Sequence, residues 1–559
     1  MKPPAGSGFL SSFFTFHDFQ SSSEWNEIDV EILARYDHNV QVTSIGPYQK
    51  IRPSHQWVPF NTHDGYHVYT FEWTPDYIAW FVDGEEIYRQ NDTFIADFHY
   101  PQKIMMNLWN PQWQDWAGEW FDAQLPIFSY YDWVSYAAYT PNAGNCGTNN
   151  NFTLQWKDDF DAFDADRWQK ATHTFDGNNC DFTPENIVFK DGKMILCLTD
   201  NDHLGLVDKN PPQMLYVWML DSTVFARFSE ELDSVSATTV GNFRIPGLAV
   251  KSVKLQSDRR TIELKVSAPQ EGRSYNLAVL GIKDRAQPAN VQIGQVVTIK
   301  RLQWLPFPIR INAGGEAFGD YLGDQQWRPD RMYGHQDGFA ETFYQHPHIT
   351  GCANDSVYWT ELHEAVTYKI RVPNGLYRLV LHLAENKVKE SGQRVFDIVA
   401  EGRKIAENLD PIAQYGFQKA VCLQADSLQV NDGILDIHLV NRIGASLLNA
   451  IEIFPLQTGL SFGRSSSVPG SFRCLPNYPN PFNNRTVFPV ALPENGTVRM
   501  RIFNLQGQVI FNKNYRNLTA GSHLIPWQAN AASGIYLVQM IYSGAAERQI
   551  QTKKIVLLK

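Results

Sequence analysis

Polar and apolar residues alternate along much of this 559-residue chain, and the alternation is strictest at residues 25–31. There Glu27, Asp29 and Glu31 are separated by single β-branched apolar residues. This pattern predicts a β-strand, on which every second side chain points to the same face. Three adjacent carboxylates do not fit a core face, because desolvating unpaired charge is costly. We expect them to line water, a metal ion or a substrate cleft.

The rest of the chain also predicts β-structure. Residues 1 to about 139 show alternating segments separated by turns such as Asp83-Gly84, with no long helical period. Short strand patterns recur between residues 217 and 279 at the spacing of a β-sandwich. No run of about 18 apolar residues occurs, which excludes a transmembrane helix. We predict an all-β chain of several domains.

Composition narrows the functional classes. Sixteen Trp and 24 Tyr form a heavy aromatic load, as expected where sugar faces stack on rings. The net charge of −11 argues against nucleic-acid binding. The six cysteines lack metal-type spacing, so they permit disulfides without requiring them.

The three acids also suggest a chemistry. Like charges this close raise at least one pKa, which keeps one carboxylic acid protonated beside an ionised neighbour. A nucleophile and an acid/base of this kind are what glycoside hydrolysis needs. The alternatives are an exposed acidic strand edge or a set of oxygen ligands for calcium. Residues i and i+4 of a flat strand lie about 13 Å apart, so a catalytic pair would require a sheet curved toward this face.

Five ordered motifs carry a family resemblance. They are SSFFTF at 11–16, WNEIDVE at 25–31, HVYTFEW at 67–73, WFVDG at 80–84 and MMNLWN at 105–110. The series resembles the lichenase branch of glycoside hydrolase family 16, whose members are retaining β-glucanases with a concanavalin-like jelly roll. The resemblance implies Glu27 as nucleophile, Glu31 as general acid/base and Asp29 as the helper between them, with no cofactor for catalysis.

The same resemblance implies further site residues. The candidate substrate contacts are Trp25, Phe14, Phe16, Asn107, Trp109 and Trp116. Asp132 and the backbone of Gly192 match ligand positions for one structural calcium. The acid triplet has no inserted residue, unlike the laminarinase branch, which favours mixed-linkage β-1,3-1,4-glucan as the substrate. Departures occur at His173 and at residues 42–44, where relatives carry other residues.

Residues 152–203 resemble the amino-terminal portion of the same fold, yet they follow residues 1–139, which resemble its carboxy-terminal portion. This order is typical of a circularly permuted jelly roll. The two chain termini of a β-sandwich domain often lie close together, so a short linker can join them. The alternative is a vestigial second domain, but so few strands could not bury a core alone. In the family an upstream strand and a signal peptide would precede Met1, so we interpret Met1 as an internal methionine or a truncated start.

Three further domains are predicted. Residues 207–304 resemble an immunoglobulin-like spacer. Residues 308–456 resemble a malectin-type domain, which implies carbohydrate binding, with a purely structural module as the alternative. Residues 473–559, opened by PNYPNPFN at 476–483, resemble the carboxy-terminal sorting domain of type IX secretion. That domain implies a type IX secretion partner and export to the cell surface or the medium.

The sequence therefore favours a secreted endo-acting β-1,3-1,4-glucanase. Two alternatives stay open: a β-1,3-glucanase of the same family, and a non-catalytic surface glycan-binding protein.

Overall fold

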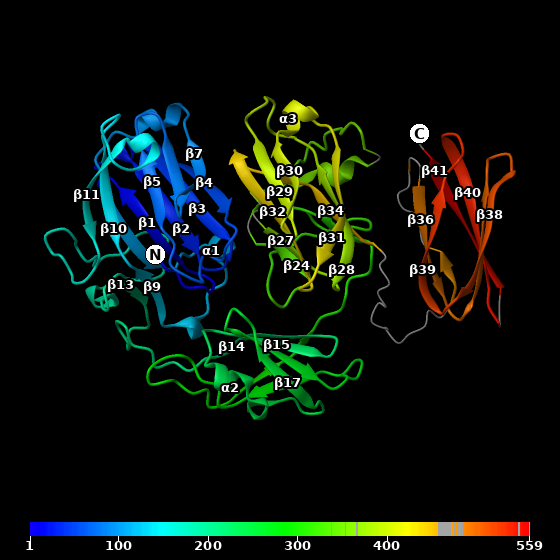
Figure 1. The fold of residues 1–559 in the computed structure, drawn as a ribbon, viewed down its shortest axis with the longest axis horizontal. Helices are drawn as coiled ribbons and strands as arrows, with labels where there is room; N and C mark the ends of the chain where they lie inside the picture. The colour runs from blue at the N-terminus through cyan, green and yellow to red at the C-terminus, as the bar shows by residue number, and fades with distance from the viewer. Residues whose placement is uncertain are drawn as a thin grey trace. The chain divides into compact units, whose positions relative to one another are not determined.

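The computed structural model describes residues 1–336, 338–352, 354–364, 367–456, 471–474, 477, 482, 485–545 and 548–557. These residues are almost entirely β-structure, which confirms the all-β prediction (Figure 1). Three short α-helices occur in the described residues: α1 (Gln114–Ala117), α2 (Ser234–Thr238) and α3 (Pro411–Gln414). Short 3-10 turns are η1 (Ser22–Glu24), η2 (Pro47–Gln49), η3 (Thr93–Asp97), η4 (Asp122–Gln124), η5 (Thr148–Asn150), η6 (Pro184–Asn186), η7 (Val240–Asn242) and η8 (Asp355–Tyr358). Nowhere in the described chain is there a helix long and apolar enough to span a bilayer.

The chain divides into two compact units, residues 1–458 and 459–559. In the first unit, the acid-bearing strand lies in the middle of a five-stranded antiparallel sheet. Its order is β4 (Lys50–Trp57), β3 (Asn39–Gly46), β2 (Glu27–Leu33), β1 (Leu10–Phe16) and β8 (Lys103–Trp109). A three-stranded sheet of β5 (Tyr69–Trp73), β6 (Ile78–Val82) and β7 (Glu85–Gln90) packs on it. The apolar positions of β2, Ile28 and Val30, are buried against Trp80 of β6.

Segments far apart in sequence share the next sheets. β13 (Met194–Leu198) pairs with β9 (Ile127–Tyr131) and with β12 (Ile187–Phe189). β11 (Phe152–Asp158) pairs with β10 (Val134–Tyr139). Buried side chains from both segments, such as Ile127 and Leu196, join Leu108 of β8 in one hydrophobic cluster. Residues 152–198 therefore pack with residues 1–139 and do not form a separate core.

Residues 214–301 form a sandwich with its own core. One sheet is β17 (Val250–Leu255), β18 (Thr261–Val266), β15 (Thr223–Phe228), β14 (Met214–Leu220) and β21 (Lys300–Arg301). The other is β16 (Phe243–Arg244), β19 (Asn276–Val279) and β20 (Gln295–Thr298). Val224, Ile262 and Leu277 are fully buried between them.

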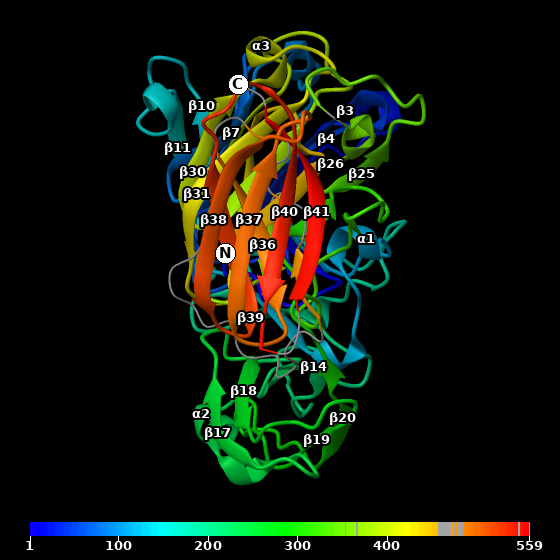
Figure 2. The same ribbon diagram turned by 90° about the vertical axis from the view of Figure 1, so that its right-hand side faces the viewer.

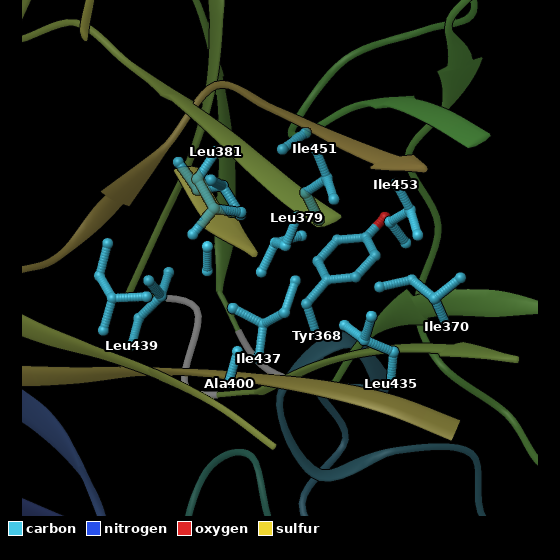
Figure 3. Packing of buried hydrophobic residues seen from close by; sticks show 14 of the residues in the cluster. Tyr368, Ile370, Leu379, Leu381, Ala400, Leu435, Ile437, Leu439, Ile451 and Ile453 are labelled. Carbon is cyan, nitrogen blue, oxygen red and sulfur yellow. The ribbon is translucent and has the colours of Figure 1, made fainter. Parts of the chain in front are cut away.

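Residues 309–456 form a larger sandwich. One sheet is β23 (Leu322–Gly323), β22 (Ile309–Asn312), β34 (Ala450–Leu456), β28 (Gly375–Leu383) and β31 (Val421–Val430). The second is β24 (Tyr333–His335), β27 (Thr367–Arg371), β32 (Ile434–Ile443), β29 (Val395–Ala400) and β30 (Arg403–Leu409). A short third sheet is β25 (Phe339–Thr342), β26 (Thr360–His363) and β33 (Leu447–Leu448). Figure 3 shows Tyr368, Leu379 and Ile437 filling the space between the two larger sheets.

The second unit is a small sandwich. Its three-stranded sheet is β35 (Arg473–Cys474), β36 (Arg485–Leu492) and β39 (Gly521–Gln528). Its four-stranded sheet, seen face-on in Figure 2, is β38 (Val509–Leu518), β37 (Gly496–Phe503), β40 (Gly534–Ser543) and β41 (Arg548–Leu557). Phe488, Met500 and Val538 are fully buried in its core.

Candidate active site

The predicted acids lie together on the open face of β2. Alternation places Glu27, Asp29 and Glu31 on one face, because their neighbours Ile28 and Val30 occupy the core face. All three carboxylates line one cleft. The six predicted substrate contacts line the same cleft: Phe14, Phe16, Trp25, Asn107, Trp109 and Trp116. The structure thus brings these nine predicted residues together.

The register of the sheet explains this arrangement. β1 and β3 flank β2, with Phe14 and Thr43 directly opposite Asp29 on either side. Pro53 of β4 lies opposite Thr43 and continues the row. No irregularity interrupts the pairing of β2 with either neighbour. The acid triplet therefore stands on a regular strand without a bulge.

Side-chain donors orient the two glutamates. The indole Nε1 of Trp25 donates to Glu27 Oε2 at 2.7 Å. Gln41 Nε2 and Thr43 Oγ1 donate to Glu31 Oε2 at 2.5 and 3.0 Å.

A second layer of contacts fixes one of these donors. Trp116 Nε1 donates to Gln41 Oε1 at 2.8 Å, which leaves the amide nitrogen of Gln41 for Glu31. Trp116 is thus connected to the acids through Gln41, a role that its sequence position did not suggest.

Burial dominates the electrostatics of the acids. It raises the pKa of Glu27 to about 7, and the nearby Glu31 charge raises it further, whereas the Trp25 indole opposes the shift. Burial also raises the pKa of Glu31 to about 7, against the hydrogen bond from Thr43, the charge of His55 and the hydrogen bond from Gln41.

Asp29 is the member held most firmly in the acid form. Burial raises its pKa well above the usual range, and the charges of Glu27 and Glu31 raise it further. Asp29 and Glu27 share a side-chain hydrogen bond that lowers the pKa of Glu27 and raises that of Asp29. Those directions mean that protonated Asp29 donates to the carboxylate of Glu27.

Aromatic rings form clusters at both ends of the predicted contact set. At one end the Trp25 ring lies 6.3 Å from Phe16 and 4.7 Å from Phe19. At the other end Trp116 lies 5.8 Å from Trp109 and 6.4 Å from Trp113, between ring centroids. Phe175, from the later segment, packs 5.0 Å from Trp109. Their flat apolar faces suit a chain of sugar rings.

The sequence reasoning missed several residues that lie in or beside the cleft. They are Phe19, Gln41, Thr43, His55, Trp113 and Phe175. Alternation on β3 places Gln41 and Thr43 on one face, but only the register with β2 brings them to Glu31. Asn107, which was predicted, accepts a hydrogen bond from the Ser12 hydroxyl.

A lysine lies beside the predicted calcium position. Lys193 Nζ donates to Asp132 Oδ1 at 2.7 Å, so an ammonium group already neutralises this carboxylate. Gly192, with φ +66°, forms the turn that precedes Lys193. A different group could hold a metal ion: carboxylate oxygens of Asp208, Glu230 and Asp284 lie within 4.8 Å of one another.

Comparisons with known families match three segments. Residues 1–125 match glycosyl hydrolases family 16, residues 307–452 match the malectin domain, and residues 477–558 match the secretion system C-terminal sorting domain. These matches confirm the three resemblances drawn from the sequence. The sorting domain indicates a secreted or cell-surface protein.

Individual proteins agree with the first match. A β-glucanase of Fibrobacter succinogenes is 36% identical over 205 residues, which cover 36% of this chain and 58% of that enzyme. A β-glucanase of Paenibacillus macerans is 36% identical over 143 residues, covering 25% and 57%. The solved β-glucanase of Bacillus licheniformis is 32% identical over 22% of this chain and 55% of its own, with a TM-score of 0.20. The chain thus spans somewhat more than half the length of each of these three relatives.

Proposed function

We propose that this chain, which carries a family 16 glycosyl hydrolase segment, is a secreted endo-acting β-glucanase that cleaves mixed-linkage β-1,3-1,4-glucan by double displacement. One observation carries the proposal: Glu27, Asp29 and Glu31 stand on one strand face, interact with one another and line an aromatic-walled cleft. Glycoside hydrolysis requires two carboxyl groups in different protonation states. The raised pKa values of these acids supply that condition near neutral pH.

The roles follow from the hydrogen bonds. Glu27, which accepts from Trp25 and from protonated Asp29, is held as the ionised nucleophile that attacks the anomeric carbon. Glu31, positioned by Gln41 and Thr43, gives its proton to the departing glycosidic oxygen. Glu31 then takes a proton from water, and that water releases the sugar from Glu27. No cofactor takes part in these steps.

The uninterrupted register of β2 supports the linkage preference. The laminarinase branch carries an inserted residue in this motif, whereas here the pairing of β2 with β1 and β3 is regular from Glu27 to Glu31. A β-1,3-glucanase activity is the second candidate, since it belongs to the same family. The malectin match gives some support to a third, a non-catalytic glycan-binding protein.

We also infer that residues 152–203 complete the jelly roll of residues 1–139 in permuted order, because β13 pairs with β9 and β11 with β10.

The predicted limits 207–304, 308–456 and 473–559 are kept as the proposed domains. Type IX secretion machinery is the proposed partner of the last one. A structural calcium, if the protein holds one, would find oxygen ligands at Asp208, Glu230 and Asp284.

A reducing-sugar assay tests the proposed function. Purified chain should release reducing ends from lichenan and barley β-glucan faster than from laminarin, and the Glu27→Gln variant should release none. Faster release from laminarin would favour the β-1,3-glucanase. Binding of glucan without turnover would leave only the hypothesis of a non-catalytic glycan-binding protein.

A further inference from the structure

We propose that the malectin domain forms part of the glucan cleft, with Phe339 as a platform on which a sugar unit distant from the acids stacks. This proposal rests on the proposed function of the cleft as a glucan site. Phe339 lines the same cleft as Glu27, Asp29 and Glu31, although it lies more than 300 residues further along the chain.

The contact between the two domains explains how this residue reaches the cleft. β4 is the edge strand of the acid-bearing sheet, and it packs against β32 of the malectin domain. Trp57 of β4 shares the face of Pro53 and His55, and its ring lies 5.1 Å from that of His438 on β32. The malectin domain therefore adjoins the sheet face that carries the acids, at the β4 edge.

Polar contacts fix the same junction. Lys369 Nζ lies 3.9 Å from Asp37 Oδ2. Gln336 Nε2 donates to the backbone oxygen of Arg35 at 3.4 Å, and Arg35 Nη2 donates to Gln326 Oε1 at 3.4 Å. Gln336 lies only three residues before Phe339, so these bonds hold the strand that carries the phenyl ring.

Much of Phe339 is open to solvent. Its side chain is 48% exposed, although it is a large apolar group. β25 pairs with β26 so that Phe339 lies opposite His363, and the two rings are 5.9 Å apart. His363 lies beside the ring on the paired strand, and Phe339 lines the cleft together with Ile51, Pro53 and His55.

The row of cleft residues leads to this platform. Phe14, Asp29, Thr43 and Pro53 lie opposite one another on β1, β2, β3 and β4, so the cleft crosses the strands. β4 lies two strand spacings, about 10 Å, from β2. Ile51 on β4 is 53% exposed, and it lines the same cleft as Phe339. A glucan long enough to pass β4 would meet the Phe339 ring, and a short oligosaccharide bound at the acids would not.

The experiment compares long and short substrates. In the full chain, Phe339→Ala should raise KM for barley β-glucan about three- to tenfold, the size expected for losing one aromatic stacking contact. It should leave kcat unchanged, and it should leave kcat/KM for a tetrasaccharide unchanged. Phe339→Trp should restore the KM for polysaccharide. Tyr344→Ala, which removes an 82% exposed ring of the same domain that does not line the cleft, is the matched control.

A binding measurement separates this proposal from the proposed function. Affinity electrophoresis on barley β-glucan, in the Glu27→Gln background, should show weaker retention for Phe339→Ala and equal retention for Tyr344→Ala. Retention that depends on Phe339, together with no turnover by the chain that keeps Glu27, would uphold the platform and overturn the hydrolase. Three outcomes would overturn the platform. Phe339→Ala could leave hydrolysis of the polysaccharide unchanged, or it could lower activity equally on long and short substrates. The Glu27→Gln chain with Phe339 in place could also show no retention on the glucan.

Discussion

Two groups of three carboxylates in residues 1–458 differ in how the chain assembles them. Glu27, Asp29 and Glu31 come from one strand, at every second position. The second group, Asp208, Glu230 and Asp284, comes from three separate segments. The first lines a cleft, and none of the second does. The two groups thus differ in their access to a cleft, which is what the proposed catalytic role of the first group requires.

The partners of the two groups differ as well. Asp284 is 1% exposed, and it accepts hydrogen bonds from the backbone nitrogens of Ala286 and Asn290. The side-chain amide of Asn290 bridges Asp284 and Asp208, at 2.7 and 3.1 Å. These bonds organise a loop. Glu27 instead receives an indole donor from Trp25, just before β2, and Glu31 receives amide and hydroxyl donors from β3. Trp116 in turn donates to the β3 amide of Gln41.

The largest expected effect comes from amide substitutions in the strand group. Glu27→Gln removes the nucleophile and Glu31→Gln removes the proton donor, so each should lower kcat on lichenan by at least about 10³-fold. Asp208→Asn, which removes a carboxylate of the other group, should leave kcat within about twofold. Initial rates of reducing-sugar release measure all three variants. A comparable loss in Asp208→Asn would erase the distinction between the groups.

The pH profile should show the next largest effect. Catalysis needs the glutamate pair to hold one proton, and the pKa values of both Glu27 and Glu31 are raised to about 7. Below the optimum the nucleophile becomes protonated, and above it the acid loses its proton, so kcat/KM should fall on both sides, by up to about tenfold per pH unit. The two apparent pKa values belong to the pair. A flat profile between pH 5 and 9 would contradict the assignment.

Asp29→Asn should have an intermediate effect. The amide can still donate a hydrogen bond to Glu27, but it cannot exchange a proton with it, so we expect kcat to fall about 10- to 100-fold. Because Asp29 is already protonated on the acidic limb of the pH profile, that limb should keep its position in Asp29→Asn. Asp29→Ala, which removes the donor completely, should be worse than Asp29→Asn. Equal activity of the two variants would show that the hydrogen bond to Glu27 has no role in catalysis.

Much of the strand group could be predicted from the sequence, because alternation is a local property. The face of β2 followed from residue types and spacing, whereas the aromatic contacts followed from the resemblance of the motifs to a known family. Gln41 and Trp116 could not be linked to Glu31, because the link depends on the register of β3 and on a contact across 75 residues. Phe339 was missed for the same reason: its place in the cleft depends on how two domains pack.

The calcium position expected at Asp132 and Gly192 stays a prediction, and the structure adds a contact there that the sequence did not indicate. Asp132 follows β9, and Lys193 precedes β13, whose pairing with β9 places Met194 opposite Tyr131. The ammonium group of Lys193 thereby reaches Asp132. A ligand position transferred from a family carries no information about a neighbouring lysine on the paired strand. The second carboxylate group was also missed, since its members are separated by 22 and 54 residues.

The smallest expected effect concerns stability and the second group. Burial and the charges of Asp208 and Asp284 raise the pKa of Glu230 to about 9. The folded state therefore keeps a proton on Glu230 that the unfolded chain releases above its ordinary pKa of about 4.3. The contribution of this group to stability is greatest at low pH and is lost as the pH rises toward 9.

Glu230→Gln removes this loss, because the amide is neutral at every pH. In calorimetric scans of the metal-free chain, the variant should unfold a few degrees higher than the unsubstituted chain at pH 8, and at nearly the same temperature at about pH 3.5, below the ordinary pKa of the carboxyl. Glu271→Gln changes an exposed carboxylate of the same sandwich and should have no effect at either pH. Equal stabilisation by Glu230→Gln at about pH 3.5 would mean that packing, and not the proton, sets the difference. The same scans on Glu27→Gln apply this test to the strand group. The pKa of Glu27 is also raised, to about 7, so its substitution should stabilise the fold at pH 8. The same substitution should abolish turnover.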